Sequence, residues 1–143
     1  MMVDFFEDLV FSEADIITFP AGIPGFENRK QFVVVSIPQL APFEWLVCVD
    51  GTHLRFAIIN PLLFSPDYAP KLNSERLAEL SVDDPKDLAL YSIVTIKENP
   101  IDSTANLAGP VFINKIKKIG KQIIIDDDRY STQEPIVRKN TSC

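Results

Sequence analysis

Residues 31–60 read "QFVVVSIPQLAPFEWLVCVDGTHLRFAIIN", and this stretch predicts three strands in succession. The three runs are short, rich in β-branched and aromatic residues, and end at Pro, Asp or Asn; they are Gln31–Ile37, Phe43–Val49 and Arg55–Asn60. Asp50-Gly51 separates the last two runs, and glycine accepts the positive φ that a tight hairpin turn requires. We therefore expect the second and third runs to pair as an antiparallel hairpin.

The same strand-like pattern recurs along most of the chain. The further candidate strands are Val3–Phe11, Ile16–Phe19, Leu88–Ile96, Gly109–Asn114 and Lys121–Asp126. Only one stretch favours a helix: in Ser74–Leu80, Asn73 or Ser74 can cap the first amides, and Leu77 and Leu80 share one face. The pattern predicts a mainly β fold, a single small antiparallel β-barrel of about eight strands with one short helix, since closure removes exposed strand edges.

Domain organisation follows from length and composition. The chain has 143 residues, of which 46% are hydrophobic and 24% charged, close to the average of globular domains. Linkers, repeats and low-complexity tracts are absent from the sequence. We expect one domain over residues 1–137 and a flexible C-terminal tail over residues 138–143.

Charge and hydropathy disfavour several classes of partner. Twenty acidic residues against fourteen basic ones give a formal net charge of −6, which repels nucleic-acid phosphates, so we expect no direct nucleic-acid binding. The longest apolar runs are far shorter than the roughly 20 residues that span a bilayer, so we expect no membrane contact. The acidic N-terminus, "MMVDFFEDLVFSEAD", is unlike a signal peptide and predicts a cytoplasmic protein.

The sequence contains few residues suited to catalysis. The only histidine, His53, falls in the predicted hairpin tip, where an exposed turn residue is the simpler interpretation. Cys48 and Cys143 have no partner at metal or redox spacing. Asp126-Asp127-Asp128 lacks the alternating ligands and the glycine of a calcium loop. We therefore expect no enzyme activity, no cofactor and no metal.

The stretch "TFPAGIPGFE", residues 18–27, predicts a rigid corner. Phosphate loops need successive backbone N–H groups, and Pro20 and Pro24 have none. The order Ile-Pro-Gly-Phe over residues 23–26 is typical of a type II turn, with Pro fixing φ and Gly taking positive φ. Such a corner holds Phe26 and Glu27 either as core anchors or as part of a binding edge.

Three stretches, taken together, resemble the flagellar assembly factor FliW family. They are "ITFPAGIPGFE" (17–27), "FAIINP" followed by "PDY" (56–68) and "STANLAGPVFINKIKKIGKQIIIDDDRY" (103–130), and they follow the family order over nearly the whole chain. One departure is Gly109, where the family commonly has Ala. The resemblance implies a non-enzymatic cytoplasmic β-barrel that binds flagellin before export and also binds the RNA-binding regulator CsrA. It further implies that the two partners compete for the protein in a partner switch, which relieves repression of flagellin translation.

Two groups of residues are candidates for binding these partners. Those that match the family motifs, and that we expect to line or shape the binding surface, are Pro24, Gly25, Phe26, Glu27, Asp67, Tyr68, Asn106 and Asn114. The asparagines could instead cap turns, and Tyr68 could be core. The acidic residues that we favour for the basic regulator are Glu75, Glu79, Asp83, Asp84, Asp126, Asp127 and Asp128. A solvated face is the alternative for these acids.

Two other functions remain open at this point. A dedicated flagellin export chaperone would bind flagellin without binding the regulator. A flavin-binding split-barrel enzyme is suggested only by the small-barrel architecture. A colourless preparation without flavin absorbance would exclude the enzyme.

Overall fold

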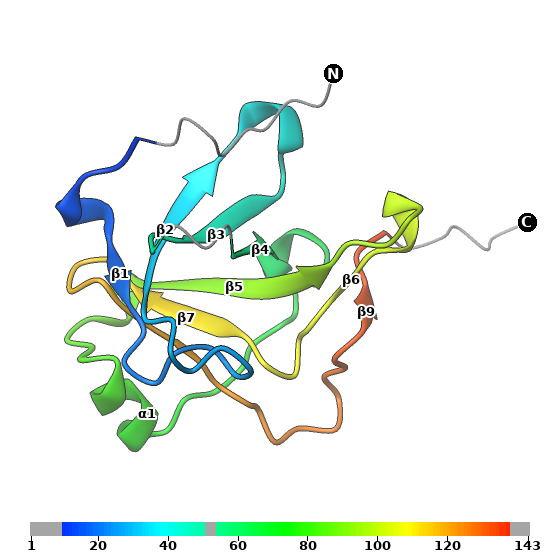
Figure 1. Ribbon diagram of the computed structural model, residues 1–143. Helices are drawn as coiled ribbons and strands as arrows, with labels where there is room; N and C mark the ends of the chain where they lie inside the picture. Colours follow the sequence, from blue (N-terminus) through cyan, green and yellow to red (C-terminus); the bar gives the residue numbers. More distant parts are fainter. Residues whose placement is uncertain (1–9, 51–53, 138–143) are drawn as a thin grey trace, which may run out of the picture.

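The computed structural model describes residues 10–50 and 54–137, which form a β-barrel with a short helix packed on its outside (Figure 1). The strands are β1 (Ile17–Thr18), β2 (Gln31–Ser36), β3 (Glu44–Cys48), β4 (Arg55–Ile59), β5 (Leu88–Thr95), β6 (Thr104–Ala105), β7 (Val111–Asn114), β8 (Ile119–Gln122) and β9 (Glu134–Pro135). The α-helix is α1 (Ser74–Glu79), and short 3-10 helices span Glu13–Asp15, Pro38–Leu40, Pro61–Leu63, Pro85–Asp87 and Pro100–Asp102.

Seven of these strands close into a ring. Their order is β4-β3-β2-β1-β8-β7-β5, and a pairing between β4 and β5 completes the circle. All the ring pairings are antiparallel except β1 with β8, where Thr18 lies opposite Ile119. An odd number of strands in a closed ring cannot alternate direction throughout, so at least one parallel pair is required. The predicted mainly β barrel with one short helix is confirmed, and it is a mixed barrel.

Residues 31–60 form β2, β3 and β4, as expected. Phe32 pairs with Cys48 across β2 and β3, and Trp45 pairs with Ala57 across β3 and β4, both antiparallel. The turn at Gly51–His53, most of the candidate strand Val3–Phe11 and the predicted tail at 138–143 lie outside the described residues.

The predicted strand Lys121–Asp126 is wrong at both ends, because β8 spans Ile119–Gln122. It starts earlier because the turn after β7 is tight: Lys118 takes a φ of 56°, and its N–H donates to the Asn114 carbonyl. It ends at Gln122 because the next partner, Pro110, has no N–H to donate. The chain nevertheless continues beside residues 108–110, since Ile123 N–H donates to the Pro110 carbonyl at 2.9 Å.

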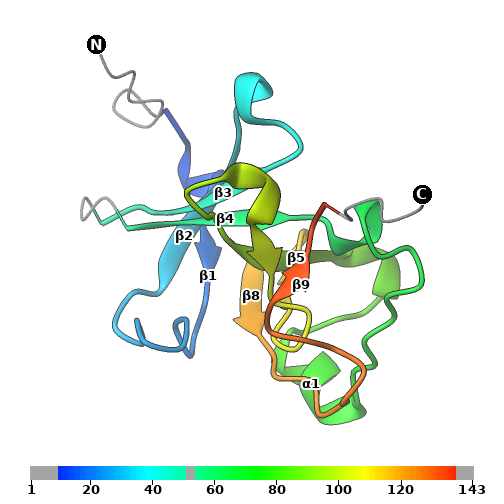
Figure 2. The same ribbon diagram turned by 90° about the vertical axis from the view of Figure 1, so that its right-hand side faces the viewer.

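The barrel interior and two outer clusters form the core. Side chains alternate faces along a strand. Ile58 therefore packs inside the barrel with Phe19 and Phe32, while its neighbours Ala57 and Ile59 pack outside. Figure 2 shows β9 in front of the barrel, and β6 lies between β5 and β9 and pairs with both. Ile136, directly after β9, packs on the outer cluster that contains Ala57 and Ile59.

The helix α1 covers the second outer cluster. The Asn73 side chain accepts a hydrogen bond from the Arg76 N–H at 2.9 Å, which confirms the predicted cap. Leu80, at the helix end, is fully buried against Phe112 of β7 and Ile123. This contact fixes the helix beside the stretch that follows β8.

Candidate protein-binding surfaces

The corner after β1 is a type II turn, as predicted. Gly25 has a φ of 89°, and the Phe26 N–H donates to the Ile23 carbonyl at 2.6 Å. Gly22 also has positive φ, at 68°, and a Cβ there would lie 2.6 Å from the Glu27 backbone. The corner therefore folds back tightly on itself.

The corner presents one aromatic ring to solvent. The Phe26 side chain is 41% exposed, whereas Ile23 is buried beneath it. The Phe26 ring meets Phe56 edge-on, with centroids 5.5 Å apart, and Phe56 in turn lies 6.3 Å from the core ring of Phe32. The ring is thus anchored on its inner edge and open on its outer face, which suits an apolar contact with a partner.

Glu27 is fixed beside this ring. Its Oε1 accepts a hydrogen bond from the Gly25 N–H at 3.1 Å. Backbone hydrogen bonds from its own N–H and from Gly25 hold the pKa of the Glu27 carboxyl below its usual range. Pro24 and Gly25 are exposed at the tip of the same turn.

Two of the motif residues, Tyr68 and Asn114, are buried. Tyr68 is buried, its hydroxyl donates to the Leu107 carbonyl at 2.5 Å, and burial raises the pKa of the phenol. Asn114 is 1% exposed; its Nδ2 donates to the carbonyls of Leu80 and Ser81, and its Oδ1 accepts from the N–H groups that follow it. Asn114 thereby joins the end of α1 to the β7–β8 turn, and Tyr68 joins its own loop to Leu107, so both side chains shape the surface from beneath.

The remaining motif residues lie in turns. Asn106 is half-buried, and its Oδ1 accepts from the Gly109 N–H at 2.9 Å. Asp67 is exposed, directly before Tyr68, whose N–H donates to the Ser65 carbonyl. The turn-capping interpretation of Asn106 thus matches its geometry.

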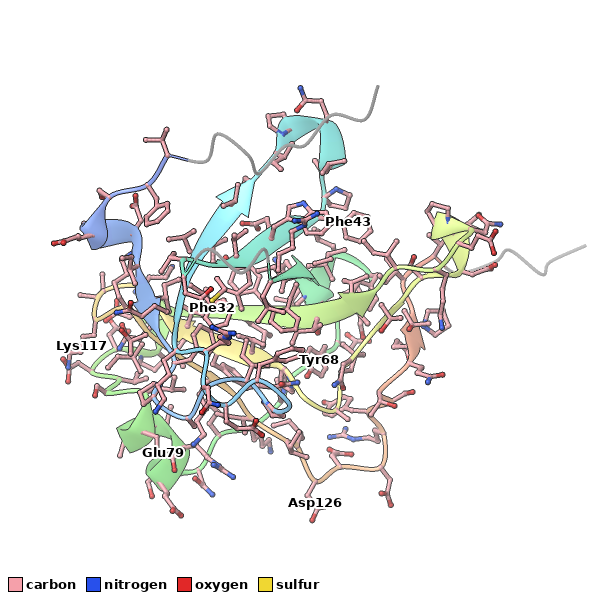
Figure 3. The ribbon with its side chains drawn as sticks, in the orientation of Figure 1. Phe32, Phe43, Tyr68, Glu79, Lys117 and Asp126 are labelled. Carbon is pink, nitrogen blue, oxygen red and sulfur yellow. The ribbon has the colours of Figure 1, made fainter. Side chains whose placement is uncertain are left out.

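The structure brings α1 and the acidic stretch after β8 to a common groove. The groove has a volume of about 440 Å³ and is lined by Ala69, Lys71, Leu72, Asn73, Arg76, Ile123, Ile124, Ile125, Asp126, Asp127 and Arg129. Glu79 on the helix and Asp126 both lie at the lower end of the molecule in Figure 3. Of the predicted acids, only Asp126 and Asp127 line the groove itself.

Basic residues interleave with these acids, and sequence reasoning missed them. Ion pairs join Glu79 to Arg76 (3.2 Å) and to Lys121 (3.0 Å). Asp83 pairs with Lys117 at 2.9 Å, on the left of Figure 3. The only available signal was the i,i+3 spacing of Arg76 and Glu79. The Lys121 contact depends on the barrel, which brings β8 beside the helix.

Asp127 is the most strongly perturbed acid of the group. The Arg129 guanidinium lies 2.7 Å from its carboxylate, and the hydrogen bonds from Arg129 lower the pKa of Asp127 to about 2. Lys121 in the same way lowers the pKa of Glu79. Asp126, Asp128 and Glu75 form no ion pair with the described part of the chain, and their exposed carboxylates remain open to a basic partner.

The described residues offer neither a metal site nor a membrane-spanning helix. Within residues 10–50 and 54–137, no group of three or more His, Cys, Asp or Glu side chains is arranged to hold a metal ion. Over the same ranges, no helix combines the length and the apolar composition needed to cross a membrane.

Comparisons with known proteins agree on one family. Residues 2–136 match the family model described as FliW protein. The flagellar assembly factor FliW of Alkaliphilus metalliredigens is 38% identical over 135 residues, covering 94% of this chain and 83% of that protein. The Caldicellulosiruptor saccharolyticus factor of the same name is 42% identical over 125 residues, covering 87% and 82%. A crystal structure of the flagellar assembly factor FliW superposes with a TM-score of 0.90 at 34% identity, covering 99% of each chain.

Proposed function

The chain belongs to the FliW family of flagellar assembly factors, and on that premise we propose that it binds flagellin and the regulator CsrA in a partner switch. Bound to CsrA, it relieves the repression of flagellin translation; bound to flagellin, it releases CsrA. It works in the cytoplasm, without catalysis, by forming stoichiometric complexes. The acidic region around α1 and residues 126–128 is the observation that carries this proposal.

The acidic region suits the regulator. An RNA-binding protein is basic, and carboxylates at the rim of an interface accelerate encounter with a basic partner. Asp126 and Asp128 are exposed and unpaired among the described residues, so their charge is available. Because the protein carries a net charge of −6, it captures the regulator without competing for the RNA backbone itself.

The corner suits flagellin. Unassembled flagellin exposes apolar helix faces, and an amphipathic helix docks on rigid apolar features. The Phe26 ring is fixed by the type II turn and by Phe56, so little entropy is lost when it becomes buried in a complex.

The test uses three purified components. The protein is mixed with CsrA and a labelled target RNA over a range of salt concentrations, and RNA release and complex size are measured. We expect RNA release that weakens as salt rises, and we expect added flagellin to restore RNA binding. Failure to release RNA at every salt concentration, with no complex on a sizing column, would overturn the proposal. A complex with flagellin alone would identify the protein as a dedicated export chaperone.

A further inference from the structure

The stretch after β8 has one satisfied edge and one open edge. Ile123 N–H donates to the Pro110 carbonyl at 2.9 Å, and Ile125 N–H donates to the Ala108 carbonyl at 2.8 Å. The backbone groups of Ile124 and Asp126 make no hydrogen bond with any described residue. Alternate bonding of this kind over residues 123–125 is the pattern of an edge strand, whose outer N–H and C=O groups are available to another chain. The Asp127 N–H donates to the Ile125 carbonyl at 3.1 Å, so the chain turns at Asp126 and the extended stretch ends there.

This open edge borders the groove beside α1. Ile124 and Asp126 both line the groove, and its other wall is formed by Ala69, Lys71, Leu72, Asn73 and Arg76. Leu72 and Ile125 are half-buried and supply apolar surface. The Ile124 side chain is 65% exposed. The groove thus combines unpaired backbone groups with an apolar lining, the two features that an added strand needs.

Some charged residues at the groove form ion pairs with described residues, and others do not. Arg76 pairs with Glu79, and Arg129 pairs with Asp127. Asp126 lies at the open edge with no ion pair to a described residue, and exposed Asp128 follows directly. Lys71 is the cation on the opposite wall that forms no ion pair with a described residue. Beside the open edge, the available charge is therefore negative.

We propose that a basic, extended segment of the regulator binds in this groove as an additional strand. The inference rests on the proposed function and names how that partner is held. The N–H and C=O of Ile124 exchange hydrogen bonds with one residue of the segment. Apolar side chains of the segment contact Leu72 and Ile125, and its basic side chains reach Asp126 and Asp128. Backbone bonds supply affinity, and the acids select a basic sequence.

Proline at position 124 tests the backbone contact directly. Ile124→Pro removes an N–H that has no partner among the described residues, and the preceding residue lies in an extended ladder compatible with proline. Ile124→Ala removes the side chain and keeps the N–H, so it is the matched control. We expect Ile124→Pro to bind the regulator about tenfold more weakly than Ile124→Ala. Ile125→Pro removes a bonded N–H and should instead lower the unfolding midpoint.

Amide hydrogen exchange on the unmodified protein gives a second readout. Addition of the regulator should slow exchange at Ile124, whose amide bonds to no described residue, while Ile123 and Ile125 are already protected in the free protein. Equal affinity of Ile124→Pro and Ile124→Ala, or unchanged exchange at Ile124 in a formed complex, would overturn the strand addition and leave the proposed function intact. Protection of Ile124 by flagellin and not by the regulator would also overturn it. Absence of any complex with the regulator would refute the proposed function itself.

Discussion

The ring of Phe19 lies so close to the backbone of Gly120 that a Cβ on Gly120 would sit 2.4 Å from the ring Cζ. Phe19 is fully buried and belongs to the barrel interior, and Gly120 lies on β8. β1 and β8 form the parallel pair of the ring. The missing side chain on β8 is therefore what allows a large ring to fill the core beside the pair that closes the barrel.

Gly120→Ala should lower the free energy of unfolding by about 1–3 kcal/mol, because the buried ring of Phe19 cannot move without shifting its neighbours. Urea unfolding followed by tryptophan fluorescence measures the loss. Gly109→Ala is the control: its added Cβ would meet the ends of the Gln122 and Asn106 side chains at 2.9 and 3.0 Å, which can move aside. Equal losses for the two variants would contradict this account.

Asn114→Ala should lower the free energy of unfolding by about 1–3 kcal/mol. The substitution leaves two carbonyls at the end of α1 and two N–H groups in the β7–β8 turn without the partners they have now. Asn106→Ala, at a half-buried position with one such bond to Gly109, should lose less. Chemical denaturation of both variants compares them, and a smaller loss at Asn114 would show that its hydrogen bonds contribute little.

Phe26→Ala should cost about 1 kcal/mol of stability, well below the value for a core phenylalanine, because its ring is 41% exposed. Flagellin binding should fall much more than stability. A pull-down with flagellin and a thermal melt of the same sample measure the two effects. A large loss of stability with unchanged flagellin binding would show that the ring is a core anchor and not a contact.

These positions show how far sequence reasoning extends. The long strands β2 to β5 were predictable because their β-branched and aromatic runs are set by local chemistry. The two-residue strands β6 and β9 are too short to produce a period. The start of β8 depends on the tight turn in which the Lys118 N–H donates to the Asn114 carbonyl, and its end depends on Pro110, features that no hydrophobic pattern encodes. The type II turn was predictable because Pro24-Gly25 has an intrinsic conformational preference.

The sequence identified individual residues of the candidate site, but not their contacts with one another. Acids at 75–84 and 126–128 were identifiable from charge, but their partners were not. Lys121 reaches Glu79 because the barrel places β8 beside α1, and sequence separation gives no sign of this contact. The open backbone edge at Ile124 is likewise a product of tertiary pairing, since it exists only because Ile123 and Ile125 bond to the opposite side.

The carboxyl of Asp127 should titrate with a pKa of about 2 in the folded protein, as followed by NMR of its side-chain carbon. Its pKa is lower than in the unfolded chain, about 3.9. The stabilising contribution of the Arg129 contact is therefore present above pH 4 and is lost as the pH falls from about 4 through about 2. Arg129→Gln should return the titration midpoint towards 3.9. A midpoint that is unchanged in this variant would show that another group holds the carboxylate.

Reversal of the open charges should slow capture of the regulator. The double change Asp126→Lys and Asp128→Lys removes two exposed carboxylates that have no ion pair with a described residue. Because rim charges act mainly through electrostatic steering, the association rate constant should fall several-fold at low salt and converge with that of the original protein at high salt. Stopped-flow mixing over a salt series measures it. Asp83→Lys reverses an acid already paired with Lys117 and changes the net charge as much as the single change Asp126→Lys does, so these two single variants form the matched pair. If Asp83→Lys slows association as much as Asp126→Lys does, the regulator responds to net charge and not to the face beside the groove.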